Sequence, residues 1–213
     1  MDIVGPHIYH YLHHPLLSSG EPMLYYTLDH LVHTGAIGYE HRRTQLGHGE
    51  HHLVDRLFLY RIADPGTLPP PEAAALSLIP EGKEYSLSDL RHEINHTYPN
   101  DHYKVFKSES MQEYLTQQGL LSTPSFTTPD GRKKYREVHH LLNQVEHDEE
   151  QLLNDHAQLQ ARLDELGSNV VLLHHSLFAK LKDLPDLDER TKTILILQTY
   201  LESGGYYHEK RMG

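Results

Sequence analysis

Two histidines and a glutamate are spaced as zinc ligands and a general base would be on a helix. His92, Glu93 and His96 form a His-Glu-x-x-His sequence, and His102 follows ten residues after His92. On a helix, imidazoles four residues apart share one face and can bind one zinc ion, while the glutamate activates a water molecule. The motif therefore offers a zinc peptidase as one alternative function, with Glu93 as the catalytic residue and zinc held by His92, His96 and His102.

Composition and one departure from the motif weaken this zinc interpretation. Because the chain has 20 histidines in 213 residues, a His-Glu-x-x-His sequence arises by chance about 0.15 times. The spacing of the three histidines resembles the metzincin motif, in which a glycine lets the chain turn after the helix. This chain has Pro99 at that place, and proline is restricted to negative φ. We therefore expect exposed histidines on a scaffold helix, without a catalytic residue, metal or cofactor.

Basic residues form two clusters that could contact phosphate groups. One cluster lies in a predicted strand and the other begins a predicted helix. Residues at such places often contact the backbone of nucleic acids in winged helices. The candidate nucleic-acid contacts are Arg42, Arg43, Arg132, Lys133, Lys134 and Arg136. The whole chain nevertheless has a net charge of -11, and general nucleic-acid binding requires a positive face. The charge balance therefore favours a protein partner over DNA.

The elements that position these residues come in a repeated order. Apolar spacing predicts a helix over 22–34, which Gly35 ends, and a shorter helix over 8–12 before it. Residues 37–43 and 55–62 are typical of strands. After a stretch rich in proline and glycine at 64–71, three more helices are predicted, starting near Glu72, after the N-cap Ser86 with Asp89, and at about 101–118. Gly119 and two short strand pieces, at 120–121 and 125–126, complete the repeat.

Both repeats contain the same joint between a helix and a strand. Leu31 to Ile37 and Leu115 to Leu121 each read as a helix end, a glycine and an apolar strand start. On this element order, residues 1–135 resemble a tandem winged-helix protein, and also tandem helix–strand modules of uncharacterised bacterial proteins. The resemblance implies an α+β, mostly helical fold with winged-helix-like modules at 1–63 and 72–131, a linker at 64–71, and a long helix with a helical tail at 132–213. Tandem winged helices occur in DNA-binding regulators and in acidic, dimeric, protein-binding subunits, so the resemblance does not choose the function.

A heptad pattern runs through the predicted long helix over 132–166. Its polar members are Glu149 and His156, and its apolar members are Val138, Leu142, Val145, Leu152, Leu159, Leu163 and Leu166. Such a helix is about 50 Å long. Either the helices predicted at 170–181 and 189–201 cover this seam, or a second chain does. Because those helices reach only part of the rod, we expect a coiled coil between two chains and a homodimer.

The remaining features concern location and partner class. The apolar stretches are too short for a transmembrane helix, the first residues lack the apolar core of a signal peptide, and cysteine is absent. We therefore expect a cytoplasmic protein without a membrane partner. Its expected role is that of a non-enzymatic interaction or regulatory protein, which acts through a protein partner or a second copy. A DNA-binding transcriptional regulator is the nearest alternative.

Overall fold

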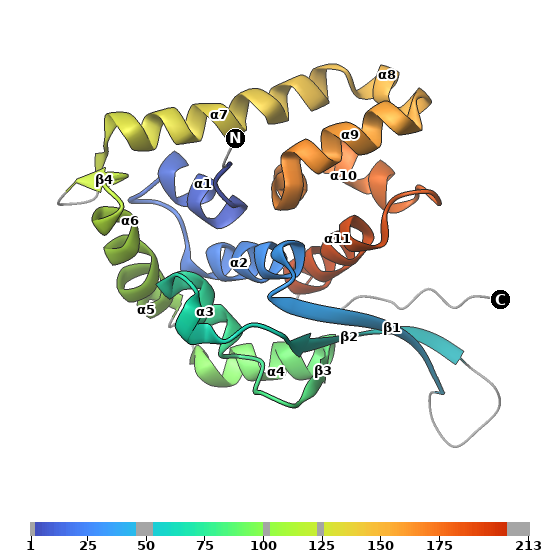
Figure 1. The fold of residues 1–213 in the computed structure, drawn as a ribbon, viewed down its shortest axis with the longest axis horizontal. Helices are drawn as coiled ribbons and strands as arrows, with labels where there is room; N and C mark the ends of the chain where they lie inside the picture. The colour runs from blue at the N-terminus through green and yellow to red at the C-terminus, as the bar shows by residue number, and fades with distance from the viewer. Residues whose placement is uncertain (1–2, 46–52, 100–102, 123–125, 204–213) are drawn as a thin grey trace.

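Helix α2 (Gly20–Thr34) runs through the middle of the protein, and the other elements are arranged around it (Figure 1). The computed structural model describes residues 3–45, 53–99, 103–122 and 126–203. The hydroxyl of Ser19 caps the start of α2 by accepting a hydrogen bond from the Glu21 amide. Gly35, with a φ of 79°, ends the helix as the sequence predicts. Helix α1 (Pro6–His13) packs beside α2.

The two predicted strands form an antiparallel hairpin. Strands β1 (Ile37–Gln45) and β2 (Leu53–Arg61) pair with Ile37 opposite Arg61. Strand β3 (Glu84–Ser86) adds to the other side of β2, which gives the order β1-β2-β3. Because side chains alternate between the two faces of a strand, Leu57 and Leu59 share the buried face of this sheet. Strand β3 comes from the second predicted module and pairs with a strand of the first.

The segment between these strands is partly helical. A short 3-10 helix, η1 (Pro65–Thr67), is followed by α3 (Pro70–Leu76), which begins within the predicted linker and contacts α2. Proline suits the first turn of a helix because its missing amide would have no partner there, and Pro71 is buried. The structure therefore places the end of this proline-rich segment against the core. The expected division into modules stays a prediction.

Helix α4 (Leu87–Thr97) lies below α2 in Figure 1, and the helices after it run up the left side of the view to a small second hairpin. Helix α4 starts with the predicted capping box between Ser86 and Asp89. The helix predicted over 101–118 is described as α5 (Tyr103–Val105), a π-helical segment η3 (Phe106–Gln112) and α6 (Glu113–Gln117). Strands β4 (Leu121–Ser122) and β5 (Phe126–Thr127) then form the two-stranded sheet.

Residues 132–166 do not form one long helix. They lie in three helices, α7 (Pro129–His147), α8 (Glu149–Asn154) and α9 (His156–Leu166), and α9 folds back beneath α7 (Figure 1). The chain leaves the helical conformation at Asp155, with φ -127° and ψ 89°, and the Asp155 carboxylate caps α9 by accepting from the Gln158 amide at 3.0 Å. A 3-10 segment η4 (Gly167–Leu172), α10 (His175–Lys182) and α11 (Glu189–Glu202) complete the mostly helical α+β fold.

This folding back changes the interpretation of the heptad seam. All seven apolar seam residues, Val138, Leu142, Val145, Leu152, Leu159, Leu163 and Leu166, are at most 5% exposed within a single chain. Helices α7 and α9 contact each other, and α1 packs under α7. The seam therefore needs no second chain to be buried. The reason for which the sequence predicts a homodimer, an uncovered seam, therefore no longer applies. The homodimer stays a prediction.

Replacing Leu159 by alanine tests whether the seam belongs to the core of one chain. Truncating a buried leucine removes its contacts and leaves a cavity, so the free energy of unfolding should fall by about 3 kcal/mol. Because the contacts are within one chain, denaturant unfolding should show the same loss at low and high protein concentration. His156→Ala, which changes an exposed member of the seam, is the matched control and should change stability little. A loss that grows on dilution would indicate that the seam lies between chains.

Candidate functional site

The histidines of the candidate zinc motif lie on the solvent-exposed side of α4. Leu90 and Ile94 of this helix are fully buried, whereas His92 and His96 are exposed. Glu93 accepts a hydrogen bond from the Thr97 hydroxyl at 3.4 Å. His102 lies outside the described residues. Within the part of the chain that the structure describes, no three histidine, aspartate or glutamate side chains are grouped to hold a metal ion.

The basic residues of β1 are already paired with acids. The guanidinium of Arg42 donates to both carboxylate oxygens of Glu84, at 2.7 and 2.8 Å, and to Glu40 at 2.5 Å. These hydrogen bonds hold the pKa values of Glu40 and Glu84 below their usual range. Arg43 contacts Asp55 at 3.3 Å. This part of the predicted nucleic-acid surface is therefore electrically neutralised.

The other basic cluster lies at a distant place, the start of α7 (Figure 1). Arg132 donates to the carbonyl of Thr127 at 2.7 Å, and Lys134 lies 3.4 Å from a carboxylate oxygen of Glu137. Lys133 and Arg136 are exposed. The structure therefore does not bring the two clusters together into one basic surface.

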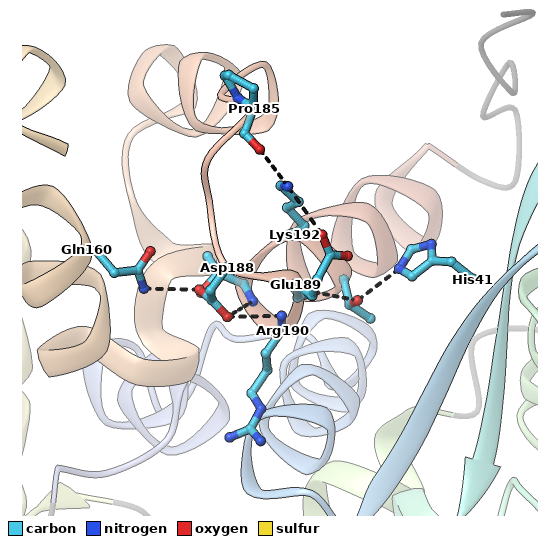
Figure 2. Close-up of polar contacts among 9 residues, drawn as sticks. His41, Gln160, Pro185, Asp188, Glu189, Arg190 and Lys192 are labelled. Carbon is cyan, nitrogen blue, oxygen red and sulfur yellow. Dashed lines mark hydrogen bonds and ion pairs between the residues drawn. The ribbon is translucent and has the colours of Figure 1, made fainter. Parts of the chain in front are cut away.

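A polar cleft of about 320 Å³ opens where the end of α2, helix α9 and the start of α11 meet. Asp188 lines this cleft and makes several of the polar contacts drawn in Figure 2. One oxygen of this carboxylate accepts from the amides of Arg190 and Thr191, at 2.9 and 3.1 Å, and the other accepts from the Gln160 amide group at 3.1 Å. Burial raises the pKa of Asp188, but these hydrogen bonds outweigh burial and hold the pKa below its usual range.

The other charged groups around this cleft also bond to neighbouring segments. Arg190 donates to the carbonyl of His33 at 3.1 Å, and Lys192 donates to the carbonyl of Pro185 at 2.8 Å. His41 of β1 and Thr193 of α11 lie within hydrogen-bond distance, at 3.1 Å (Figure 2). These hydrogen bonds therefore connect α2, β1, α9 and α11, and the polar groups at the cleft are already engaged in contacts within the protein.

A second polar cluster lies where α1, α2, α3 and η4 meet, and it was not anticipated from the sequence. His7 is 1% exposed, and its ring centre lies 5.2 Å from that of His30. The Nδ1 atom of His30 lies 2.9 Å from the hydroxyl of Ser168, and its Nε2 atom lies 3.9 Å from a carboxylate oxygen of Glu72. The Nδ1 atom of His7 has no hydrogen-bond partner among the described residues.

This cluster has the residue types of an acyl-transfer triad but not its accessibility. Ser168 is only 2% exposed, so a substrate carbonyl cannot reach its hydroxyl without displacing η4. The gap between His30 and Glu72 also exceeds hydrogen-bond length. The two histidines of this cluster, buried His7 and half-buried His30, are instead neutral, because burial lowers their pKa values.

Asp29 is a further buried titratable group on α2. It is fully buried, and neither carboxylate oxygen meets a hydrogen-bond donor among the described residues. Burial, and then the charge of Glu202, raise the pKa of Asp29 well above its usual value. The carboxyl group is therefore held in its neutral form, because an unpaired buried charge is unfavourable.

The sequence contained only a weak signal for these buried groups. The spacing of Leu24, Leu28 and Leu31 predicts one apolar face for α2, and Asp29 and His30 fall beside it. Periodicity does not show that neighbouring elements cover the remaining faces as well. The full burial of Asp29 and the partial burial of His30 follow from tertiary packing.

Comparisons with known proteins do not assign a function to either place. No protein-family model, curated protein or solved structure matches this chain. Among the described helices, none combines the length and the hydrophobicity that crossing a bilayer requires.

The buried histidines predict how stability depends on pH. Burial, and then His30, hold the pKa of His7 well below its usual value, and burial, and then His33, lower the pKa of His30 to about 4. The unfolded chain binds protons at these histidines below about pH 6.5, whereas the folded protein does not. The contribution of the two neutral histidines to the free energy of unfolding is therefore fully present above that pH and is lost as the pH falls toward the folded pKa values. In His7→Leu, the slope of unfolding free energy between about pH 6 and pH 5 should decrease by about 1.4 kcal/mol per pH unit.

Denaturant unfolding at several pH values measures this slope. His96→Leu, which changes an exposed histidine of α4, is the matched control and should keep the slope of the unchanged protein. An unchanged slope in His7→Leu would contradict the assignment of His7 as a buried neutral group.

Proposed function

We propose that the chain is a non-enzymatic interaction module that acts through a protein partner. The observation that supports this is a row of apolar side chains on the outer face of the β1-β2-β3 sheet. Phe58, Tyr60 and Ile62 follow one another at every second position of β2 and just beyond it, on the face opposite Leu57 and Leu59. Ile62 is 61% exposed, and Phe58 and Tyr60 are partly exposed.

Neighbouring residues hold the two aromatic rings in place. Tyr60 lies opposite Gly38 in the sheet, and its ring occupies the space above that glycine, where a Cβ atom would come within 2.3 Å of it. The guanidinium of Arg42 lies 5.0 Å from the ring centre of Phe58. A surface that is already ordered loses little conformational freedom on binding, which favours affinity.

The composition of this outer sheet face fits a protein partner. Tyrosine, phenylalanine and arginine are enriched at protein interfaces, and exposed apolar side chains gathered on one face mark binding sites. Strand β1 lies at the edge of the sheet, where a strand of a partner can add. The pairing of Arg42 with Glu40 and Glu84 removes the positive charge that DNA would require.

The proposal also includes the identity of one possible partner and the cellular compartment. A second copy of this chain is one protein partner that the outer sheet face could bind, in agreement with the expected homodimer. We place this function in the cytoplasm, where a chain without cysteine needs no oxidising compartment.

Site-specific photo-crosslinking in cells tests this proposal. A photoreactive residue at Tyr60 should give adducts with a defined protein, whereas the same residue at the exposed Gln151 of α8 should not. With that protein purified, Ile62→Ser should weaken binding about tenfold, and Gln151→Ser should leave the affinity unchanged. Equal adducts from both positions, or adducts with nucleic acid at Tyr60, would contradict the proposal.

A further inference from the structure

The connection between α1 and α2 holds two leucines out into solvent. Leu16 is 70% exposed and Leu17 is 85% exposed. Phe126 of β5 is 62% exposed. These are three of the five large apolar side chains that remain exposed in the described part of the chain, and exposure of this kind is unfavourable unless another body covers them.

Hydrogen bonds fix the backbone of this connection. The amides of Leu17 and Ser18 donate to the carbonyl of His14, at 3.1 and 2.9 Å. The ammonium group of Lys107 donates to the carbonyl of Ser18 at 2.8 Å and lies 5.6 Å from the ring centre of Tyr11. The two leucines therefore lie on a turn whose backbone is held by hydrogen bonds.

Contacts between segments place this turn beside β5 and the start of α7. The hydroxyl of Thr127 donates to the carbonyl of Leu12 at 3.3 Å. The rings of His13 and Tyr135 stack with their centres 5.1 Å apart. In Figure 1 the connection runs past β4 at the end of the molecule where α7 begins. The exposed apolar residues therefore lie at the same end of the protein as the basic start of α7.

The first turns of α7 supply cations at this end. Arg132 and Arg136 are four residues apart and so share one side of the helix. Both are exposed, as is Lys133, while Asp130 is the acid of the first turn. We call the surface formed by Leu16, Leu17, Phe126, Arg132 and Arg136 the apolar–basic rim. Its positive charge stands out in a chain with a net charge of -11.

We propose that the apolar–basic rim attaches the protein to the surface of an anionic lipid membrane. A side chain that is 85% exposed, such as Leu17, projects from the surface and cannot line a groove, so it suits insertion into a soft apolar layer. Arg132 and Arg136 then lie near lipid phosphates, where each basic residue strengthens binding. Acidic residues elsewhere matter less, because salt screens charges beyond about 8 Å.

This contact differs from the membrane partner that the hydropathy of the sequence argues against. That argument concerns a spanning helix, which requires about 20 apolar residues. Surface attachment requires only a few apolar tips together with cations. The rim also lies away from the outer sheet face, so the two binding surfaces can be changed separately.

Flotation with lipid vesicles tests this proposal. The full chain should float with vesicles of phosphatidylcholine and phosphatidylserine, and less with phosphatidylcholine alone or at high salt. Leu17→Ser should weaken binding to the mixed vesicles about tenfold. The double variant Arg132→Glu, Arg136→Glu should remove the preference for phosphatidylserine.

Ile62→Ser is the matched control, because it removes another large exposed apolar side chain, 61% exposed, from the outer sheet face. It should bind the vesicles as the unchanged protein does, even where it loses the protein partner. Failure of the unchanged chain to bind mixed vesicles, or equal binding by Leu17→Ser, would overturn the proposal. Crosslinking of an acidic protein at Leu17 in the presence of vesicles would assign the rim to a protein instead.

Discussion

The packing of most other elements against α2 is the constraint on which the rest of the structure depends. Helices α1, α3 and α11, segment η4 and strand β1 all contact this one helix. Met23, Leu24, Leu28 and Leu31 are fully buried in the result. Because α2 contacts both the elements before residue 77 and those after residue 166, the N-terminal and C-terminal parts of the chain share one hydrophobic core. Such burial is the main favourable contribution to folding.

This constraint also explains where the unusual polar groups lie. A helix in contact with so many elements buries polar as well as apolar positions, so Asp29 is fully buried and His30 is half-buried. Their charged forms are disfavoured there, so burial raises the pKa of Asp29 and lowers the pKa of His30. The surfaces proposed for recognition lie outside this buried core. They are the outer sheet face around Tyr60 and the apolar–basic rim around Leu17, where exposed side chains have no structural duty in the core.

Local signals in the sequence predicted most of the individual elements. Gly35 ends α2 and Ser86 with Asp89 starts α4 because these effects act within a few residues. The residue types of strands β1 and β2 predicted these two strands equally well. The sequence did not predict that the chain turns back at Asp155. A heptad pattern is the same whether the helix packs against another chain or against the next helix of its own chain. Likewise, the pairing of Arg42 with Glu84 joins residues 42 positions apart, and local sequence patterns do not predict such a pair.

Native-state hydrogen exchange of α2 and α11 tests most directly whether one core unites the chain. The account predicts that buried amides of these two helices and of α7 exchange only through global unfolding, with the same free energy and the same dependence on denaturant. Exchange of α1, α2 and β1 through a separate opening, at a lower free energy than the exchange of α7, would contradict it. In that case residues 1–63 would form an independent module, and α2 would not be the element that joins the two halves of the protein.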